Sequence, residues 1–272
     1  MTAVDHAGGA SSTGLPARSV DGLACWSREH VLWLGFDRPR AANAVDGTLA
    51  TALAGALARA GEDERVRAVV LTGLGGRVFS AGIDVRNPGG LDHEALSTYR
   101  RTTVETCMKA ILAFDKPLVA AVGGPAVGLG CMLALLADRV LASDTAYLSL
   151  PEIDIGIPTF LGVSILRFTS GAAVARDLVL TGRRLAASEA LQRGVIACCV
   201  EAAELDAAAQ AEARALASKP ATTYALAKQW IARGLREDID AGNARAAEVQ
   251  PQLEAAARAR EAAAGGQDTE GR

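Results

Sequence analysis

The sequence predicts an α/β protein built on a largely parallel sheet. Continuous apolar runs of strand length, VRAVVLTG at 66–73 and KPLVAAVGG at 116–124, alternate with segments of helical periodicity up to residue 150. From Ser164 onward the chain is nearly all helical. With 272 residues, no long linker and no internal repeat, one α/β core followed by a helical part is the simplest organisation.

The N-terminal elements carry clear local signals. The apolar runs Leu23–Ser27 and His30–Phe36 flank the polar corner at Arg28 and Glu29 and predict a hairpin. Asp46 is a plausible N-cap for a helix over 47–63. The other predicted elements are a helix at 93–114, a turn and helix at 127–138, short strands at 140–143 and 146–150, and helical segments at 164–182, 186–194, 204–218 and 222–238.

Composition divides the chain into four regions. Residues 1–20 are small and polar and are expected to form a flexible arm, and residues 259–272 a flexible tail. Between them we expect an α/β core at 21–200 and a helical region at 201–258. The N-terminus lacks the apolar stretch of a secretory signal, and no apolar run approaches the roughly 20 residues that span a bilayer.

Charge and cysteine usage exclude several classes of function. The net charge of −3, without a basic stripe, argues against nucleic-acid binding. The five cysteines form no C-x-x-C pair, which favours free thiols in a reducing cytoplasm. The three histidines are scattered along the chain, so neither a histidine-based metal site nor a Ser-His-Asp triad is supported.

Two glycine-containing loops follow predicted strands, FSAGID at 79–84 and GGPAVGLG at 123–130. Neither fits a dinucleotide or P-loop fingerprint, and each alone is typical of a tight strand-to-helix turn. Together, two such turns can aim backbone N–H groups at one point and form an oxyanion hole. The donors would be the N–H groups of Ile83 and Leu129, and the hole would suit a thioester enolate.

An isolated acid, Glu152, follows Pro151 within the apolar segment LSLPEIDIGI. Partial burial there would raise the pKa of Glu152 toward the range of a general base. The alternative is an ordinary solvated or helix-capping carboxylate. If the segment is extended, Asp154 lies on the same side and is a second candidate acid, since strand side chains repeat every two residues. Otherwise Asp154 is a structural or solvated acid.

Five segments, in order and at similar intervals, resemble the crotonase superfamily, the enoyl-CoA hydratase/isomerase family. The resemblance covers residues 21–235. Its segments are FDRPRAANAV at 36–45, VRAVVLTGLGGRVFSAGIDV at 66–85, KPLVAAVGGPAVGLGCMLALLADRVLAS at 116–143, LSLPEIDIGI at 148–157 and LTGRRLAASEALQRGVI at 180–196.

The resemblance implies a crotonase-type spiral of ββα units followed by a C-terminal helical trimerisation region. It also implies a homotrimer or hexamer, and a coenzyme A thioester as substrate, with no further cofactor and no metal. Ile83 and Leu129 fall at the oxyanion positions. Lys228 falls where a C-terminal basic residue approaches coenzyme A. Arginines suit its phosphates, although each could equally be a solvated surface residue. The implied substrate-binding residues are Arg40, Ala42, Asp84, Val85, Arg86, Gly128 and Met132.

The chain departs from the family pattern at three places. Hydratases of the family use two glutamates, but here the first position is Met132, which cannot donate a proton. One carboxylate beside an oxyanion hole suits double-bond isomerisation slightly better than hydration. Hydration by Glu152 alone and a non-catalytic binding protein remain alternatives. Leu129 replaces the usual glycine, so we expect a negative φ there. The C-terminus lacks the usual family pattern.

The acyl group is not determined by these motifs. The residues that would shape its pocket lie mainly in NPGGLDHEALSTYRRTT at 87–103 and IPTFLG at 157–162.

Overall fold

A computed structural model describes residues 19–86 and 88–267 of the chain. Its main sheet has seven strands in the order β1-β2-β3-β4-β5-β7-β10, and a second sheet joins β6, β8 and β9. The predicted α/β class is therefore confirmed. The strands are β1 (Ser19–Val20), β2 (Leu23–Arg28), β3 (Val31–Phe36), β4 (Ala68–Gly73), β5 (Leu118–Val122), β6 (Ala126–Val127), β7 (Arg139–Ser143), β8 (Tyr147–Ser149), β9 (Leu185–Ala186) and β10 (Cys198–Val200).

The predicted N-terminal hairpin is confirmed, with its turn one residue later than expected. Strands β2 and β3 pair antiparallel, and the turn residues Glu29 and His30 have φ of 47° and 68°. Two residues with positive φ give the backbone twist that joins antiparallel strands in a two-residue turn. The following helix α1 (Gly47–Glu62) begins where predicted, because the Asp46 side chain accepts a hydrogen bond from the Leu49 N–H.

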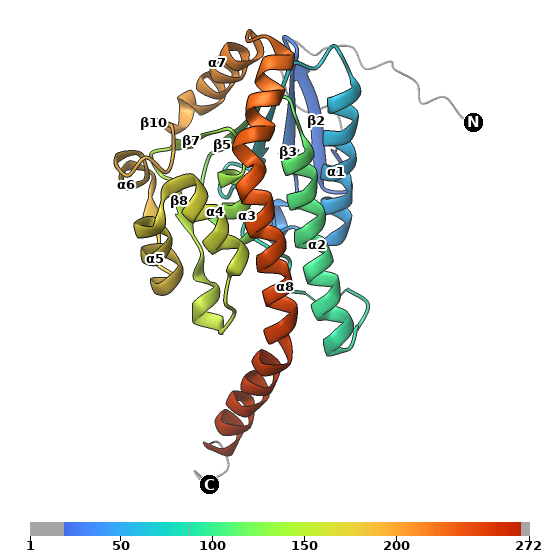
Figure 1. Ribbon diagram of the computed structural model, residues 1–272, viewed down its shortest axis with the longest axis vertical. Helices are drawn as coiled ribbons and strands as arrows, with labels where there is room; N and C mark the ends of the chain where they lie inside the picture. Colours follow the sequence, from blue (N-terminus) through green and yellow to red (C-terminus); the bar gives the residue numbers. More distant parts are fainter. Residues whose placement is uncertain (1–18, 87, 268–272) are drawn as a thin grey trace, which may run out of the picture.

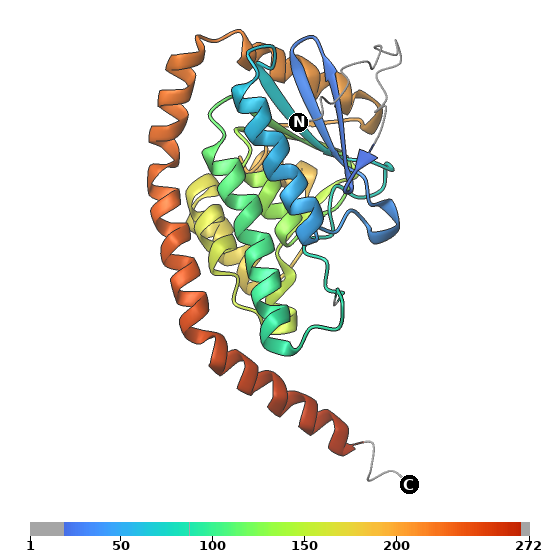
Figure 2. The ribbon, with the colours of Figure 1, turned by 90° about the vertical axis from the view of Figure 1, so that its right-hand side faces the viewer.

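The centre of the sheet is parallel and buried on both faces. β3, β4, β5, β7 and β10 run parallel, and every residue of β5 is buried. Along β4, Val69 and Leu71 enter one apolar core while Ala68 and Val70 enter another. Figure 2 shows α1 and α2 (His93–Ala113) on the near side of the sheet and α7 (Leu205–Ala217) behind it. This double burial explains why the strands read as continuous apolar runs.

The C-terminal part is helical, as predicted, but divided differently. The predicted segment at 164–182 forms two helices, α4 (Phe160–Ser170) and α5 (Ala172–Thr181), separated by Gly171 with φ of +87°. A residue with that φ cannot continue a right-handed helix. Shorter elements are α3 (Leu129–Leu135), α6 (Ala187–Gln192) and the 3-10 helices η1 (Pro39–Ala41), η2 (Pro151–Ile155) and η3 (Ala202–Glu204).

The last helix, α8 (Ala221–Gln267), runs along the molecule in Figure 1 and packs against α4. It extends beyond the predicted segment at 222–238 and continues through residues 259–267, so the prediction of a flexible tail from residue 259 is wrong for these residues. Pro251 lies inside it, where proline removes one backbone hydrogen bond. Gln250 of α8 donates to the Ser97 hydroxyl of α2 at 3.0 Å. Residues 1–18, most of the predicted arm, and 268–272 lie outside the described residues.

No helix within the described ranges combines the length and the hydropathy that crossing a bilayer requires. The five cysteines are all free thiols.

Candidate active site

The two glycine turns predicted from the sequence lie against each other. A Cβ added to Gly82 would come 2.9 Å from the carbonyl oxygen of Val127 and 3.4 Å from the backbone nitrogen of Leu129. Gly82 and Gly128 have φ of +97° and +54°. Both positions therefore require glycine, for backbone conformation and, at Gly82, also for the close approach of the other turn.

A short ladder of backbone hydrogen bonds holds these turns. The Val45 N–H donates to the Gly82 carbonyl and the Asp84 N–H donates to the Val45 carbonyl, both at 2.8 Å. On the other side, the Gly128 N–H donates to the Ser149 carbonyl at 2.9 Å. Each loop is thus anchored to a neighbouring segment by its backbone.

The N–H groups of Ile83 and Leu129 form no hydrogen bond with any other described residue. Leu129 is the first residue of α3, where a helix leaves its N–H groups without intrahelical partners. Its φ lies outside the left-handed region, which confirms the prediction of negative φ. Two adjacent turns therefore each present one unpaired backbone donor.

The Glu152 carboxyl group lies over the second turn. Its Oε1 would be 3.1 Å from a Cβ on Gly128, and its Oε2 is buried without a hydrogen-bond partner in the described structure. Burial raises the pKa of the Glu152 carboxyl, because the charged form is poorly solvated there. The sequence-based expectation of a half-buried acid with a raised pKa holds.

Met132 lies one turn into α3 and is 6% exposed, as part of the main apolar core. Its backbone N–H donates to the Gly128 carbonyl at 3.0 Å. Its side chain adds an apolar surface and no proton donor. The position therefore supplies no second acid.

The expectation for Asp154 rested on an extended segment, and that premise was wrong. Residues 151–155 form the 3-10 helix η2, begun by Pro151 with its fixed φ. In such a helix, residues two apart do not share a face. The Asp154 carboxylate lies instead over Gly182, with Oδ2 2.9 Å from a Cβ placed there. Glu152 and Asp154 therefore face different surroundings.

Asp84 is buried in a group of charges beside the first turn. Its carboxylate accepts hydrogen bonds from Arg86 Nε at 2.9 Å and Arg38 Nη2 at 3.0 Å, and Arg38 also pairs with Asp46 at 2.8 Å. The Arg86 guanidinium, and secondly that of Arg38, hold the pKa of Asp84 well below its usual range. Asp84 is therefore engaged within the protein.

The other predicted substrate-binding residues lie around the same loops. Arg40 and Arg86 are exposed, and Val85 is 67% exposed. Ala42 caps η1 with φ of 49°, and its carbonyl accepts from the Ala81 N–H at 2.9 Å. These surfaces border the two turns. Lys228 does not, because its Nζ is held 2.9 Å from both Asp138 Oδ2 and the Lys116 carbonyl, and burial lowers its pKa.

Sequence reasoning missed Asn43 as an organiser of the site. The buried Asn43 amide donates to the carbonyls of Leu74 at 3.0 Å and Val78 at 2.8 Å. Its backbone carbonyl accepts from the Ser80 hydroxyl at 2.8 Å. Asn43 thus ties the segment that follows β3 to the loop that carries Gly82. Its place in the Arg-Pro segment of FDRPRAANAV was the available signal.

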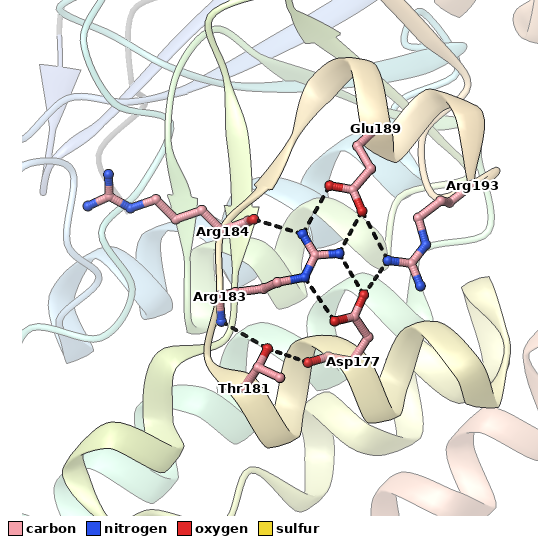
Figure 3. A network of polar contacts seen from close by, with 6 residues as sticks. All are labelled: Asp177, Thr181, Arg183, Arg184, Glu189 and Arg193. Carbon is pink, nitrogen blue, oxygen red and sulfur yellow. Dashed lines mark hydrogen bonds and ion pairs between the residues drawn. The ribbon is translucent and has the colours of Figure 1, made fainter.

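A cluster of four charged side chains lies between α5 and α6 (Figure 3). Arg183 donates to Asp177 at 2.8 Å and to Glu189 at 2.6 Å, and Arg193 pairs with the same two carboxylates. The cluster joins α5 to the segment that contains β9, which pairs with β8. Strand β8 is followed by η2, which contains Glu152.

Comparisons with known proteins agree with this fold. Residues 27–265 match the family model described as enoyl-CoA hydratase/isomerase. The chain is 33% identical to the carboxymethylproline synthase of Pectobacterium carotovorum, over 75% of this chain and 81% of that one. It is 37% identical to the 2,3-dehydroadipyl-CoA hydratase of Escherichia coli, over 62% of this chain and 65% of that one. The enoyl-CoA hydratase/isomerase structure from Pseudoalteromonas atlantica superposes with a TM-score of 0.76 and 31% identity, over 91% of this chain and 97% of that one.

The fold and the family match define an acyl-CoA enzyme of the crotonase superfamily. The chain belongs to the enoyl-CoA hydratase/isomerase family. The resemblance inferred from five sequence segments and the crotonase-type fold class are both confirmed.

Proposed function

We propose that the protein moves the double bond of an enoyl-CoA thioester through an enolate, with Glu152 as the single acid/base. One observation carries the proposal: the two unpaired N–H groups of Ile83 and Leu129 belong to turns in contact, and the Glu152 carboxyl lies over the second of them. The two donors and the base thus belong to adjoining turns, as stabilisation of a thioester enolate would require.

The backbone donors stabilise the charge that develops during the reaction. When a proton leaves carbon, the electron pair of the C–H bond moves into the thioester and places negative charge on its oxygen. The N–H groups of Ile83 and Leu129 hold that oxygen. Removing one donor from comparable sites raises the barrier by about 3–4 kcal/mol.

Glu152 transfers the proton between two carbons of the substrate. Its ionised carboxylate removes a proton from the carbon beside the carbonyl or from the vinylogous position, and then returns it to the other end of the enolate system. The raised pKa of Glu152 makes it a stronger base than a solvated carboxylate. The oxidation state of the substrate does not change, so the reaction calls for no redox cofactor.

Met132 supports isomerisation over hydration. Addition of water needs one group to deprotonate water and another to protonate carbon, a task that two carboxylates share. The buried Met132 leaves Glu152 without a partner and keeps the pocket apolar. Hydration by Glu152 alone is the second candidate, favoured by a relative named as a hydratase.

Coenzyme A would lie along the loops that border the turns. The exposed arginines Arg40 and Arg86 supply cations for its phosphates. Ala42, Val85 and Gly128 offer backbone close to the ligand. Asp84 acts indirectly, because its carboxylate orients Arg86 through bonds to Nε and Nη2.

We also infer a homotrimer or hexamer. Helix α8 exposes the large apolar side chains Leu226, Trp230 and Ile231, each more than 60% accessible in the single chain. An apolar group of this size on a helix is typical of a surface that another subunit covers. Light scattering coupled to size-exclusion chromatography measures the assembly, and a monomer at micromolar concentration contradicts this inference.

The reaction is tested with matched series of trans-2-enoyl-CoA and 3-enoyl-CoA thioesters. Double-bond migration and water addition are followed separately by chromatography of the products. We expect migration to exceed hydration, and Glu152→Gln to abolish both. Rapid hydration of crotonyl-CoA would favour the hydratase, and binding without turnover of any thioester would contradict catalysis altogether.

A further inference from the structure

Arg100 of α2 has fewer partners than its surroundings require. One Nη2 hydrogen bond goes to the Val85 carbonyl, while its Nε is buried with no acceptor in the described ranges. No carboxylate of the described structure forms an ion pair with it, in contrast to Arg38 and Arg86, which share Asp84. Within the described residues, the Nε–H is therefore the Arg100 donor that is both buried and unpaired.

The Arg100 side chain continues the inward face of α2. Thr103 and Cys107, three and seven residues further along the helix, are both buried, and Val104 packs against the main apolar core. Residues at this spacing share one face of a helix. The next residue, Arg101, is exposed. Adjacent residues of a helix point about 100° apart, and of these two arginines only Arg100 is half-buried.

The contact with Val85 places Arg100 near the proposed oxyanion hole. Val85 lies two residues after Ile83, so its carbonyl is at most about 10 Å along the chain from the Ile83 N–H. If the thioester oxygen is bound at the Ile83 N–H, the far end of the acyl chain can extend over a distance of this order toward Arg100. The core contacted by Val104 also includes Ile83, Leu129 and Met132. The hydrogen bond to the Val85 carbonyl is therefore what places Arg100 beside the first turn.

A partly buried cation without a counter-ion is unfavourable, and an anion that enters beside it relieves this. A carboxylate is the best fit, since a guanidinium binds its two oxygens in a planar, bidentate way. We propose that Arg100 binds a carboxylate at the distal end of the acyl group. On the proposed function, on which this inference rests, the substrates are thus coenzyme A thioesters of dicarboxylic acids.

The same chemistry could in principle serve a phosphate of coenzyme A. Because Arg40 and Arg86 are more exposed than Arg100, we assign the phosphates to them and the carboxylate of the acyl group to Arg100. Phosphates stay hydrated and match the exposed Arg40 and Arg86, whereas Arg100 is half-buried on the side of α2 that carries the buried Thr103 and Cys107. The two sources are separable, because a phosphate is present in every thioester and a distal carboxylate is not.

The test measures equilibrium binding with pairs of saturated thioesters of equal chain length, succinyl-CoA against butyryl-CoA and adipyl-CoA against hexanoyl-CoA. These ligands have no double bond to move, so the result does not depend on turnover. We expect the wild-type protein to bind the better-fitting carboxylated member about 10- to 100-fold more tightly, the range of a hydrogen bond to a charged group. Arg100→Gln should abolish this preference and leave the affinity for the uncharged thioester unchanged.

Two further variants complete the design. Arg100→Lys keeps the positive charge but loses the planar guanidinium that binds both carboxylate oxygens, and it should retain part of the preference. Arg101→Gln removes a neighbouring, exposed arginine and should retain all of it. Circular dichroism and thermal unfolding confirm that each variant is folded.

Equal wild-type affinity for carboxylated and uncharged thioesters would overturn the proposal without any variant. A parallel loss of affinity for all four thioesters and for coenzyme A itself in Arg100→Gln would also overturn it, and would assign Arg100 to the phosphates. Failure of the proposed isomerase would show differently, as absent turnover with the carboxylate preference intact.

Discussion

The carboxyl oxygen Oε1 of Glu152 lies 3.1 Å from the point where a side chain on Gly128 would begin. The candidate base Glu152 thus packs against Gly128, which has no side chain and a φ of +54°. Leu129, the next residue, supplies one of the two unpaired N–H groups. The acid and the backbone donor are therefore positioned by the same turn.

Gly128→Ala should lower kcat strongly and the free energy of unfolding only modestly. The added Cβ meets Glu152 and adopts a positive φ, which costs roughly 1–2 kcal/mol in a non-glycine residue. Displacement of Glu152 and of the Leu129 N–H should lower kcat at least tenfold. Steady-state kinetics and thermal unfolding measure the two effects.

Gly61→Ala is the matched control for that variant. Gly61 lies in α1, and nothing stands within 4 Å of a Cβ added there. Alanine should stabilise the helix by about 0.5–1 kcal/mol and leave kcat unchanged. Equal kcat values for Gly128→Ala and wild type would show that the turn tolerates a side chain and does not hold the base.

Glu152→Gln should lower activity at least about 100-fold, the usual effect of losing a general base. For the wild type, activity should rise with pH through the pKa of Glu152, since the base must be ionised. That midpoint should lie above the ordinary carboxyl value, because burial raises the pKa. A pH profile of kcat/KM measures it, and a midpoint at or below the ordinary value would contradict the assignment.

The same substitution should increase stability at neutral pH. The folded-state pKa of Glu152 exceeds the unfolded value, so its contribution to stability is full below the unfolded pKa and is lost as the pH rises through the folded pKa. Glutamine does not titrate. Urea unfolding should therefore show a gain for Glu152→Gln over wild type that grows with pH, and a gain independent of pH would argue against a raised pKa.

Met132→Glu should shift the reaction toward hydration. It adds a carboxyl group one turn into α3, on the helix that begins at Leu129. Burial of the new group should destabilise the fold by about 1–3 kcal/mol. Product analysis with crotonyl-CoA gives the ratio of water addition to double-bond migration. Met132→Gln, which is polar but cannot exchange a proton at neutral pH, should leave that ratio unchanged.

Asn43→Ala should destabilise the fold by about 2 kcal/mol or more, because the carbonyls of Leu74 and Val78 lose their donor. Alanine also has to adopt the φ of 54° that Asn43 tolerates. Asn43→Gly removes the hydrogen bonds without that strain and should be less destabilising. Chemical denaturation ranks the three proteins, and equal stability of all three would show that these hydrogen bonds are replaced by water.

Local patterns predicted the central strands and most helices well, but several short elements were missed. Buried strands such as β5 are apolar throughout, and α1 carries its own cap. Strands β9 and β10 contain two and three residues, and only their pairing with β8 and β7 makes them strands. The predicted helix at 164–182 ran through Gly171, because periodicity alone does not reveal a positive φ.

The candidate site divides in the same way. Glycine, proline and an isolated glutamate are local signals, so the two turns and Glu152 could be located from the sequence. Whether Asp154 faces the same side as Glu152 could not be predicted, because this depends on whether residues 151–155 are extended or helical. Asn43, and the pairing of Arg38 with Asp84, escaped notice, since these partners lie up to 46 positions apart.

The sequence by itself determined the α/β class, the order of the elements, the two glycine turns and the absence of a second glutamate at Met132. These depend on backbone preferences and apolar periodicity, which act over a few residues. Only the tertiary structure decided that the turns touch, that Glu152 is buried without a partner, that Asp154 faces Gly182 and that Arg100 turns inward. Those properties depend on which distant groups share a space, and therefore on the solvation and pairing that each group finds there.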